Sequence, residues 1–347
     1  MENYVRGTCQ TMCPRKEAEL RQRENLLHKF EMKRGTECHR LPEFDPARVV
    51  KCFNRSAAGK ETTNPSNLRP FPVLLKTINY LYQEVFPFHK EKPLYVYNFM
   101  FDRFRAIRQD VVIQNLGPLE TIKVLEPIVK FLMYFGYLLS DVDVNEFDGH
   151  INQSHLQECL KRLLVCYDEC RDDEGNTNRW DIESAYILLN LGNIKPLTRG
   201  IHLCETLGVN KTYKTCVELS LQWYLRNYSR VFCMITQLPP LLLCAVSTCL
   251  PEIRKYSLQA MAFAYSSANS AYPLSHLFSL LLFETEEELE KECNYFNIKI
   301  SNGKVNFLKK DFDSAAKSKS GIRLSWVDCK LSNCDINKLL CFGSNKW

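Results

Sequence analysis

The spacing of apolar residues predicts a long series of amphipathic helices in the middle of the chain. From residue 71 onward, apolar side chains recur about every fourth position, as in Leu74, Ile78, Leu81 and Val85, which places them on one side of a helix. The predicted helices cover residues 71–86, 94–115, 119–139, 152–171, 179–192, 196–207, 211–227, 229–237, 239–249 and 252–267. Because the connections are short, neighbouring helices are expected to pack antiparallel. No fixed-period repeat accompanies them, so the series predicts an irregular helical array.

The pattern changes after residue 270. An apolar helix is predicted over 275–283, and a second helix begins in "TEEELEKECNYF", where Thr285 and Glu288 have capping-box spacing. The next segment, "IKISNGKVNFL", alternates apolar and polar residues around Asn302-Gly303, which is typical of a β-hairpin. Helix, helix and hairpin in this order are the layout of a winged-helix module. The segment "IRLSWVDCKL" (322–331) is interpreted as a further strand.

The N-terminal residues have another character. Residues 14–34 are predicted to form one charged helix with a thin apolar stripe, beginning at Pro14. Residues 35–70 contain four prolines and many small polar residues, which favours extended chain. The predicted fold is therefore all-α: an N-terminal arm (1–70), a PCI/TPR-like helical-repeat array (71–270), and a winged-helix module with a small β-hairpin and a tail (271–347).

Composition adds modest limits. Of the 347 residues, 45% are hydrophobic and 24% are charged, with a net charge of +5; these values are ordinary for a folded domain and permit an anionic partner. The longest apolar segment, "LPPLLLCAVSTCLP" (238–251), is too short and too interrupted by prolines to span a bilayer. The first residues resemble no secretory signal, so the 16 cysteines are expected to be reduced thiols in the cytosol or nucleus.

Six stretches resemble the SAC-three/GANP family, whose members are PCI-like scaffolds. They are "GTCQTMCPRKE" (7–17), "DPARVVKCFNRSAAGK" (45–60), "LRPFPVLLKTINYL" (68–81), "FMFDRFRAIRQD" (99–110), "YILLNLGN" (186–193) and "YPLSHLFSLLLFETEEE" (272–288). The stretches occur in the family's order over nearly the whole chain. The length is most similar to the short, SAC-three-domain-containing branch.

The resemblance implies a scaffold that is not an enzyme. It implies a PCI-domain partner, docked winged helix to winged helix, with a small acidic helical peptide; together they would form a composite basic surface for RNA. The longer members act in nuclear mRNA export, whereas the short branch is associated with centrosome duplication, the spindle and mitotic progression. Centrosomal proteins are therefore further candidate partners, and the expected locations are the nucleus, the cytoplasm, the centrosome and the spindle.

Two cysteines in the first motif are weak candidates for a metal site. Cys9 and Cys13 are separated by three residues, and the nearest further candidate ligands are Cys38 and His39. A structural zinc site needs four ligands and more often has two residues between a cysteine pair. The favoured alternative is that both thiols pack against the helical body, so no metal or other cofactor is expected.

The segment "FDRFRAIRQD" is the densest charged motif. Arg103, Arg105 and Arg108 are candidates for contacts with RNA phosphates. The alternative is an ion-pair network with Asp102 and Asp110 that fixes helix packing. The network is favoured because the acids lie so close in the sequence.

The predicted second helix of the winged-helix module is acidic, and this argues against DNA recognition by that helix. Partner docking is expected instead at Glu286, Glu287, Glu290 and Phe296. Basic residues follow. They either contact nucleic acid without sequence preference or form a solvated face, and the sequence favours neither alternative. These residues are Lys299, Lys304, Lys309 and Lys310. The alternative function is a stand-alone winged-helix transcriptional regulator that binds nucleic acid.

Catalysis has little support in the sequence. The seven histidines are scattered, without the paired spacing of a metalloprotease, and no nucleophile elbow is present. The segment "AAGKETT" (57–63) lacks the residues that a phosphate-binding loop requires at two positions. Trp223 and Tyr224 are interpreted as packing residues rather than as part of a cofactor site.

Overall fold

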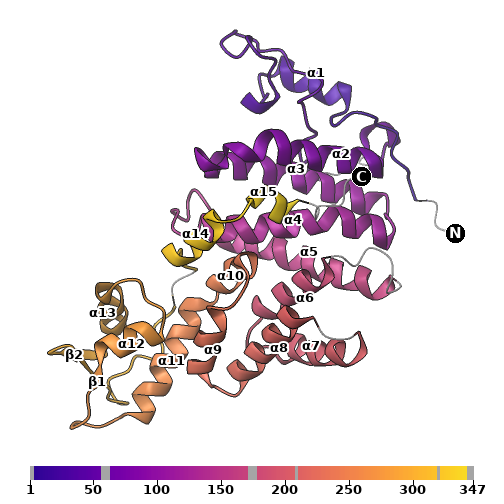
Figure 1. The fold of residues 1–347 in the computed structure, drawn as a ribbon. Coiled ribbons are helices and arrows are strands. Elements are labelled where there is room, and N and C mark those ends of the chain that lie inside the picture. Colours follow the sequence, from indigo (N-terminus) through magenta and orange to yellow (C-terminus); the bar gives the residue numbers. More distant parts are fainter. Residues whose placement is uncertain (1–3, 56–62, 171–177, 208–209, 319–320, 342–347) are drawn as a thin grey trace. The chain divides into compact units, whose positions relative to one another are not determined.

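The computed structural model describes residues 4–55, 63–170, 178–207, 210–318 and 321–341 (Figure 1). Contacts divide the chain into two compact units. Unit 1 comprises Met1–Leu132, Ser154–Thr177 and Ile336–Trp347, and unit 2 comprises Met133–Gln153 and Asn178–Asp335. Most of the segment 57–63, which lacks two of the residues that a phosphate-binding loop requires, lies outside the described residues.

Unit 1 is built from helices and short turns. Its helices are α1 (Arg15–Arg23), α2 (Phe71–Tyr80), α3 (Pro93–Ile113), α15 (Ile336–Leu340), the first part of α4 (Pro118–Leu138) and the last part of α5 (Gly149–Glu169). Short 3-10 turns occur at Lys29–Glu31, Pro65–Asn67 and Phe86–Lys90, and a wider π-type turn at Leu81–Val85 joins α2 to the last of them. Leu74 and Ile78 are completely buried on α2, as their spacing predicts.

The single helix predicted over residues 14–34 is wrong. Helix α1 ends at Arg23 because Asn25 adopts a left-handed conformation, with φ of 54°, and the Leu26 amide donates to the Arg21 carbonyl at 2.7 Å. This arrangement is a common way to end a helix. The chain then turns, and the Glu31 side chain accepts a hydrogen bond from the His28 amide at 3.2 Å. This bond caps the short 3-10 turn at Lys29–Glu31, so these residues do not continue α1.

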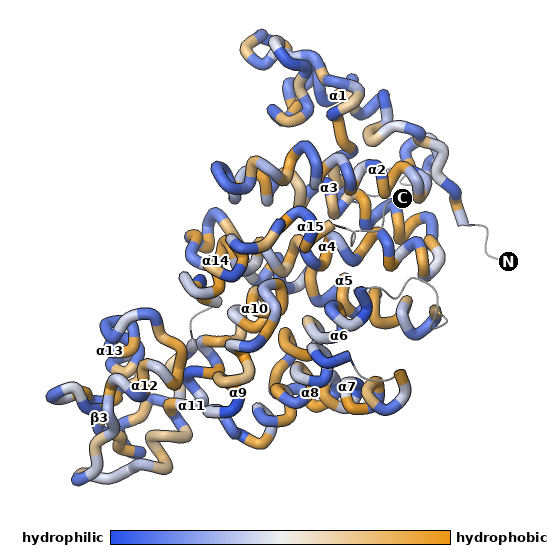
Figure 2. Tube along the Cα trace, viewed as in Figure 1, coloured by the Kyte–Doolittle hydropathy of each residue, from blue (hydrophilic) through white to orange (hydrophobic). Residues whose placement is uncertain are grey.

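Unit 2 contains the remaining helices and the strands. They are α6 (Arg179–Leu188), α7 (Ile194–Thr206), α8 (Lys211–Tyr224), α9 (Tyr228–Ile235), α10 (Pro240–Ser247), α11 (Leu250–Ala264), β1 (Tyr272–Pro273), α12 (Leu274–Leu280), α13 (Glu286–Tyr295), β2 (Lys299–Ser301), β3 (Lys304–Asn306) and α14 (Ser325–Ser332). Apolar and polar residues alternate along these helices (Figure 2). Apolar side chains from α6, α7 and α8 meet in one buried cluster, which includes Ile187, Leu197 and Tyr213.

The ten helices predicted between residues 71 and 267 are confirmed as α2 to α11, with ends that differ by a few residues. The confirmed feature is thus the mainly helical fold. Within the described part of the chain, no helix combines the length and apolar character needed to cross a bilayer.

Three short strands form one antiparallel sheet in the order β1-β3-β2. Strands β2 and β3 pair with Ser301 opposite Lys304, and the two residues between them, Asn302 and Gly303, both have positive φ. Asn and Gly adopt this conformation at low cost, so this pair of residues determines where the chain reverses.

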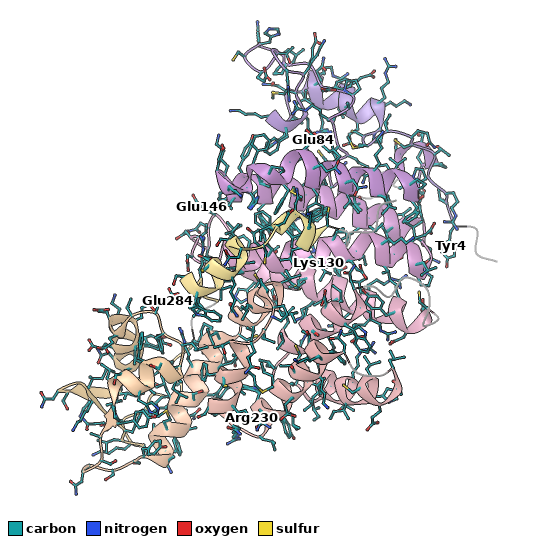
Figure 3. All side chains as sticks on the ribbon, viewed as in Figure 1. Tyr4, Glu84, Lys130, Glu146, Arg230 and Glu284 are labelled. Atoms are coloured by element: carbon teal, nitrogen blue, oxygen red, sulfur yellow. The ribbon has the colours of Figure 1, made fainter. Side chains whose placement is uncertain are left out.

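The strand predicted over 322–331 is wrong, because this segment contains helix α14. Its buried residues are Leu324, Val327 and Leu331, a three-and-four spacing that suits a helix and not a strand. The Tyr137 hydroxyl, at the end of α4, accepts a hydrogen bond from the Leu324 amide at 3.0 Å and donates to Asp328 at 2.9 Å. Figure 3 shows side chains lying between neighbouring helices within each unit.

Candidate interaction surfaces

A buried charge cluster holds the N-terminal arm against α3 in unit 1. Asp110 on α3 is completely buried and accepts hydrogen bonds from Lys51 Nζ at 2.6 Å and from Arg69 Nε at 2.7 Å. Arg69 also donates to the Met12 carbonyl at 3.3 Å, and the Lys51 amide donates to the same carbonyl at 3.0 Å. One carboxylate therefore holds two cations that fix the backbone of the first motif.

Glu31 forms the second half of the buried charge cluster. Its carboxylate accepts hydrogen bonds from Arg21 at 2.7 Å, from Arg103 at 3.1 Å and from the Val50 amide at 3.0 Å. Burial alone would raise the pKa of Glu31, but Arg103 and Arg21 outweigh it and lower the pKa below its ordinary value. The carboxylate thus stays charged and connects three segments that are distant in the sequence.

The candidate metal ligands have other contacts. Cys9 is buried and donates to the Thr11 carbonyl at 3.3 Å, while Cys13 accepts from Arg21 at 3.4 Å. Burial raises the pKa of Cys13 to about 12, which disfavours the thiolate that a metal would need. Cys38 is exposed. Among residues 4–55 and the other described ranges, no group of three or more His, Cys, Asp or Glu side chains could hold a metal ion.

The three arginines of "FDRFRAIRQD" have different surroundings. Arg103 is only 6% exposed and pairs with Glu31 and with Asp102, so it belongs to the buried charge cluster and does not present a phosphate-binding surface. Arg105 and Arg108 are half-buried. The Arg105 guanidinium lies 3.8 Å from the centre of the Phe53 ring, and Arg108 pairs with Glu158. The geometry therefore favours the packing role for this motif.

Helix α13 has an acidic outer face and an apolar inner face. Glu286, Glu287 and Glu290 are exposed, and Leu289 is completely buried. The expectation that Phe296 offers a docking surface is wrong, because its side chain is 0% exposed and stacks on Phe312 at 5.5 Å between ring centres. Phe296 instead stabilises the small domain formed by α12, α13 and the sheet.

Arg254 attaches this small domain to α11. It donates to the Leu281 carbonyl at 2.9 Å, and its guanidinium lies 3.8 Å from the centre of the Phe283 ring. Burial lowers the pKa of Arg254 to about 10, despite the opposing effect of Glu292, Glu288 and Glu284. The positive charge of Arg254 on α11 thus lies beside the carbonyl groups at the C-terminal end of α12, where a cation is stabilising.

The four candidate lysines lie on or after the sheet. All four are exposed: Lys299, Lys304, Lys309 and Lys310. Lys299 forms an ion pair with Asp311 at 3.5 Å. The Lys309 ammonium lies 4.7 Å from the centre of the Phe263 ring on α11, so the chain after β3 brings this one lysine against the helical array.

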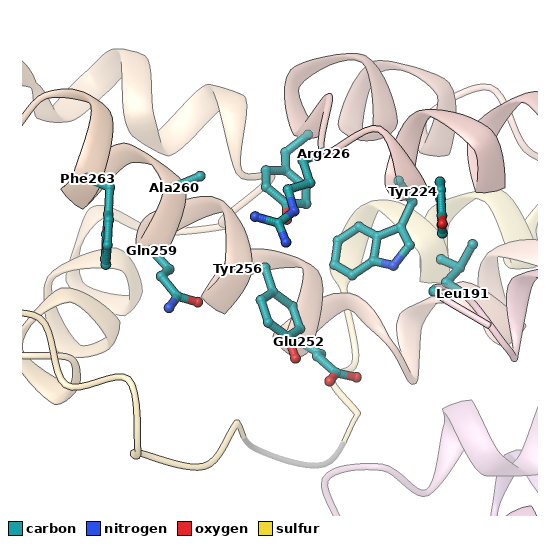
Figure 4. Close-up of a pocket in the computed structure, with 11 residues that line it drawn as sticks. Leu191, Tyr224, Arg226, Glu252, Tyr256, Gln259, Ala260 and Phe263 are labelled. Carbon is teal, nitrogen blue, oxygen red and sulfur yellow. The ribbon is translucent and has the colours of Figure 1, made fainter. Parts of the chain in front are cut away.

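An aromatic groove of about 760 Å³ lies beside α8 and α11 in unit 2 (Figure 4). The residues that line it are Leu191, Gly192, Trp223, Tyr224, Arg226, Tyr228, Glu252, Tyr256, Gln259, Ala260 and Phe263. Figure 4 shows Tyr256, Gln259 and Phe263 following one another along α11. Tyr224 and Arg226 come from the end of α8 and the turn after it. The interpretation of Tyr224 as a packing residue is wrong, because 56% of it is exposed.

Comparison with known proteins decides the family. The family model described as "SAC3/GANP family" matches residues 12–302. This chain belongs to the SAC3/GANP family. The resemblance seen in the sequence is thereby confirmed, and the matched residues of the SAC3/GANP chain include the buried charge cluster, the aromatic groove and α13.

Three curated relatives are similar over most of the SAC3/GANP chain. "SAC3 family protein 1" of Schizosaccharomyces pombe is 28% identical, over 94% of this chain and 34% of its own length. "Protein xmas" of Drosophila melanogaster is 26% identical, over 87% of this chain and 15% of its own length. "SAC3 family protein B" of Arabidopsis thaliana is 26% identical, over 86% and 18% respectively. The chain therefore spans between 15% and 34% of the length of these relatives.

The sequence did not predict the aromatic groove of this SAC3/GANP protein. Its rings come from the end of α8, the start of α9 and one side of α11, and only tertiary packing brings them together. One signal was available: Tyr256 and Phe263 are seven residues apart on the same predicted helix, which places both on one face.

Proposed function

We propose that this chain is a non-catalytic scaffold that acts in mRNA export and in mitosis, including centrosome duplication and spindle assembly. Its residues 271–347 would form a winged-helix module that docks against the winged helix of a PCI-domain protein. The order of α12, α13 and the β2–β3 pair supports this assignment, and membership of the SAC3/GANP family supports a scaffold role.

The observation that carries the proposal is the acidic outer face of α13. Glu286, Glu287 and Glu290 point to solvent, and carboxylates repel the phosphates of a nucleic acid. In a DNA-binding winged helix this helix would be basic, so the face suits a protein surface of opposite charge. Complementary charge of this kind increases the rate of association and selects the partner.

The proposal includes further partners and locations. A small acidic helical peptide would join the PCI-domain partner, and centrosomal proteins would bind during mitosis. RNA would be contacted by the exposed lysines near the sheet, Lys299, Lys304, Lys309 and Lys310. The protein would work in the nucleus and in the cytoplasm, where it would reach the centrosome and spindle.

The proposal is tested by affinity capture of the full chain from interphase and mitotic cells. The variant E286K/E287K/E290K should lose a PCI-domain partner that the natural chain captures. The matched control E146K/E205K reverses two glutamates that are exposed elsewhere and should retain that partner. Capture of the same PCI-domain protein by the α13 variant at undiminished yield would contradict the docking surface.

A further inference from the structure

The aromatic groove beside α8 and α11 is not used by the buried charge cluster or by α13. Its rings are presented to solvent, since Tyr224 is 56%, Phe263 50% and Tyr256 39% exposed. Tyr256 and Phe263 lie two turns apart on α11, about 10 Å along the helix axis. Large exposed rings gathered in one groove mark a binding site more often than isolated ones do.

The wall of the groove is built from closely fitted residues. Gly192, in the turn after α6, has φ of +85°, and a Cβ atom there would lie 2.8 Å from Nε1 of Trp223. Trp223 in turn makes edge-to-face contacts with Tyr228 and Tyr256, at 5.1 Å and 5.6 Å between ring centres. These contacts fix the ring positions in the absence of a ligand, which lowers the entropic cost of binding.

Cations lie in the groove and at one end of it. Arg226 is exposed in the groove. At the Phe263 end, the Lys309 ammonium lies 4.7 Å from the ring centre, and Lys310 follows it on the surface. Glu252 is at the other end of α11, eleven residues before Phe263, and therefore does not cancel the positive charge beside the lysines.

We propose that the aromatic groove binds a single-stranded nucleic acid, with bases stacked on Tyr224, Tyr256 and Phe263. The phosphates would be neutralised by Arg226, Lys309 and Lys310. Aromatic rings combined with nearby cations are the usual composition of a surface that holds single strands, because every base has a face that can stack. Glu252 and Gln259 supply side-chain groups that can form hydrogen bonds with the polar edges of bases.

Charge favours a nucleic acid over an apolar peptide as the occupant. An apolar peptide would use the rings but would gain nothing from the cations Arg226, Lys309 and Lys310 around them. A strand of phosphates and bases uses both features at the same time. The inference deepens the RNA contact of the proposed function, and it does not depend on docking through α13.

The test measures binding of a fluorescent twelve-residue oligouridylate to the full chain. Y224A and F263A should each weaken binding by about fivefold or more, because the loss of one stacked base costs about 1–3 kcal/mol. The exposed phenylalanine of unit 1 supplies the matched control F88A, which should bind as the natural chain does. Thermal melting of each variant shows whether the fold is retained.

Salt dependence separates the cations from the rings. K309A/K310A should decrease the slope of log affinity against log salt by about 1.4, since each neutralised phosphate of a single strand contributes roughly 0.7. Y224A and F263A should leave this slope unchanged. The control K211A/K214A removes two exposed lysines from the start of α8 and should not alter it.

Cross-linking identifies the site directly. An oligouridylate that contains 4-thiouridine should label peptides from α11 and from residues 223–228. Labelling confined to other segments, or unchanged affinity of both ring variants, would overturn the inference. Groove variants that keep the oligonucleotide but lose a captured protein would also overturn it and identify a peptide site. Charge reversal on α13 leaves the groove rings in place, so Y224A and F263A should weaken binding to the same extent in that background as well. Failure of the docking proposal is therefore distinguishable from failure of this one.

Discussion

Lys51 of the N-terminal arm reaches Asp110 on α3 across 59 residues of sequence, with 2.6 Å between Nζ and Oδ1. Both side chains are almost fully removed from solvent. Attraction between buried charges offsets the cost of burying them only while both partners are present. This contact attaches the arm to α3, and the loss of either side chain should strongly decrease the free energy of unfolding.

The first prediction concerns D110N. The substitution removes the negative charge and leaves Lys51 and Arg69 buried without a counterion, so the free energy of unfolding should decrease by about 3 kcal/mol or more. Urea denaturation of the full chain measures the change. The control E19A breaks an exposed pair with Arg15 and should cost no more than about 0.5 kcal/mol. A decrease below about 1 kcal/mol for D110N would contradict the stated role of Asp110.

The second prediction concerns acid stability. Arg103 and Arg21 lower the pKa of Glu31 in the folded chain below its ordinary value of 4.5. The unfolded state therefore binds more protons in this range, and the stability contributed by Glu31 is complete above pH 4.5 and is lost as pH falls through the lower folded pKa. Urea midpoints measured between pH 3 and pH 6 should show this decrease.

In E31Q the side chain no longer titrates, and its part of the pH dependence should disappear. The variant will be less stable at pH 6, because Arg21 and Arg103 lose their charged partner. The difference between the variant and the natural chain should therefore become smaller as the pH falls. A constant difference from pH 6 to pH 3 would show that Glu31 is not the titrating group.

Local spacing explains why the helical array could be predicted. Leu74 and Ile78 are buried on the same side of α2, and their spacing alone reports that face. The end of α1 could not be predicted in this way, because Leu20 and Leu27 continue a helical spacing while the turn depends on the left-handed Asn25. The spacing of apolar residues indicates which face of a helix is buried, but it contains little information about the residue at which the helix ends.

Long-range partners explain why the sites were predicted only in part. The sequence favoured an ion-pair network of the arginines in "FDRFRAIRQD" with Asp102 and Asp110. In the structure Arg103 pairs with Asp102, whereas Asp110 pairs with Lys51 and Arg69. The structure adds Glu31 and Lys51 from the arm, which are 72 and 59 residues away from their partners on α3. No spacing within one helix indicates such a pair, and the same reason applies to the rings of the aromatic groove.

The third prediction concerns the close approach of Gly7 to the chain before α2. A Cβ atom on Gly7 would lie 2.4 Å from the Leu68 carbonyl oxygen, and the neighbouring Cys9 amide donates to that same oxygen at 3.0 Å. G7A should therefore displace the first motif and cost about 1–3 kcal/mol. Hydrogen exchange of residues 8–13 should become faster than in the natural chain.

G117A supplies the matched control for this change. The nearest atom to a Cβ atom on Gly117 is the Glu120 carboxylate at 4.0 Å, which is an ordinary contact, so exchange in residues 8–13 should remain slow. Equal exchange in G7A and in the natural chain would show that the arm adjusts to the added methyl group.

The last prediction concerns Tyr137, which fixes the chain before α14. Its fully buried hydroxyl accepts from the Leu324 amide at 3.0 Å and lies 2.9 Å from Asp328. Y137F removes this acceptor and leaves the Leu324 amide without it, which costs about 1–3 kcal/mol for a buried donor. Hydrogen exchange of residues 322–332 should accelerate, with little change in residues 197–203 of the cluster between α6 and α8. The control Y224F removes an exposed hydroxyl and should leave both regions unchanged. If residues 322–332 exchange equally in Y137F and the control, this hydroxyl does not hold α14 in place.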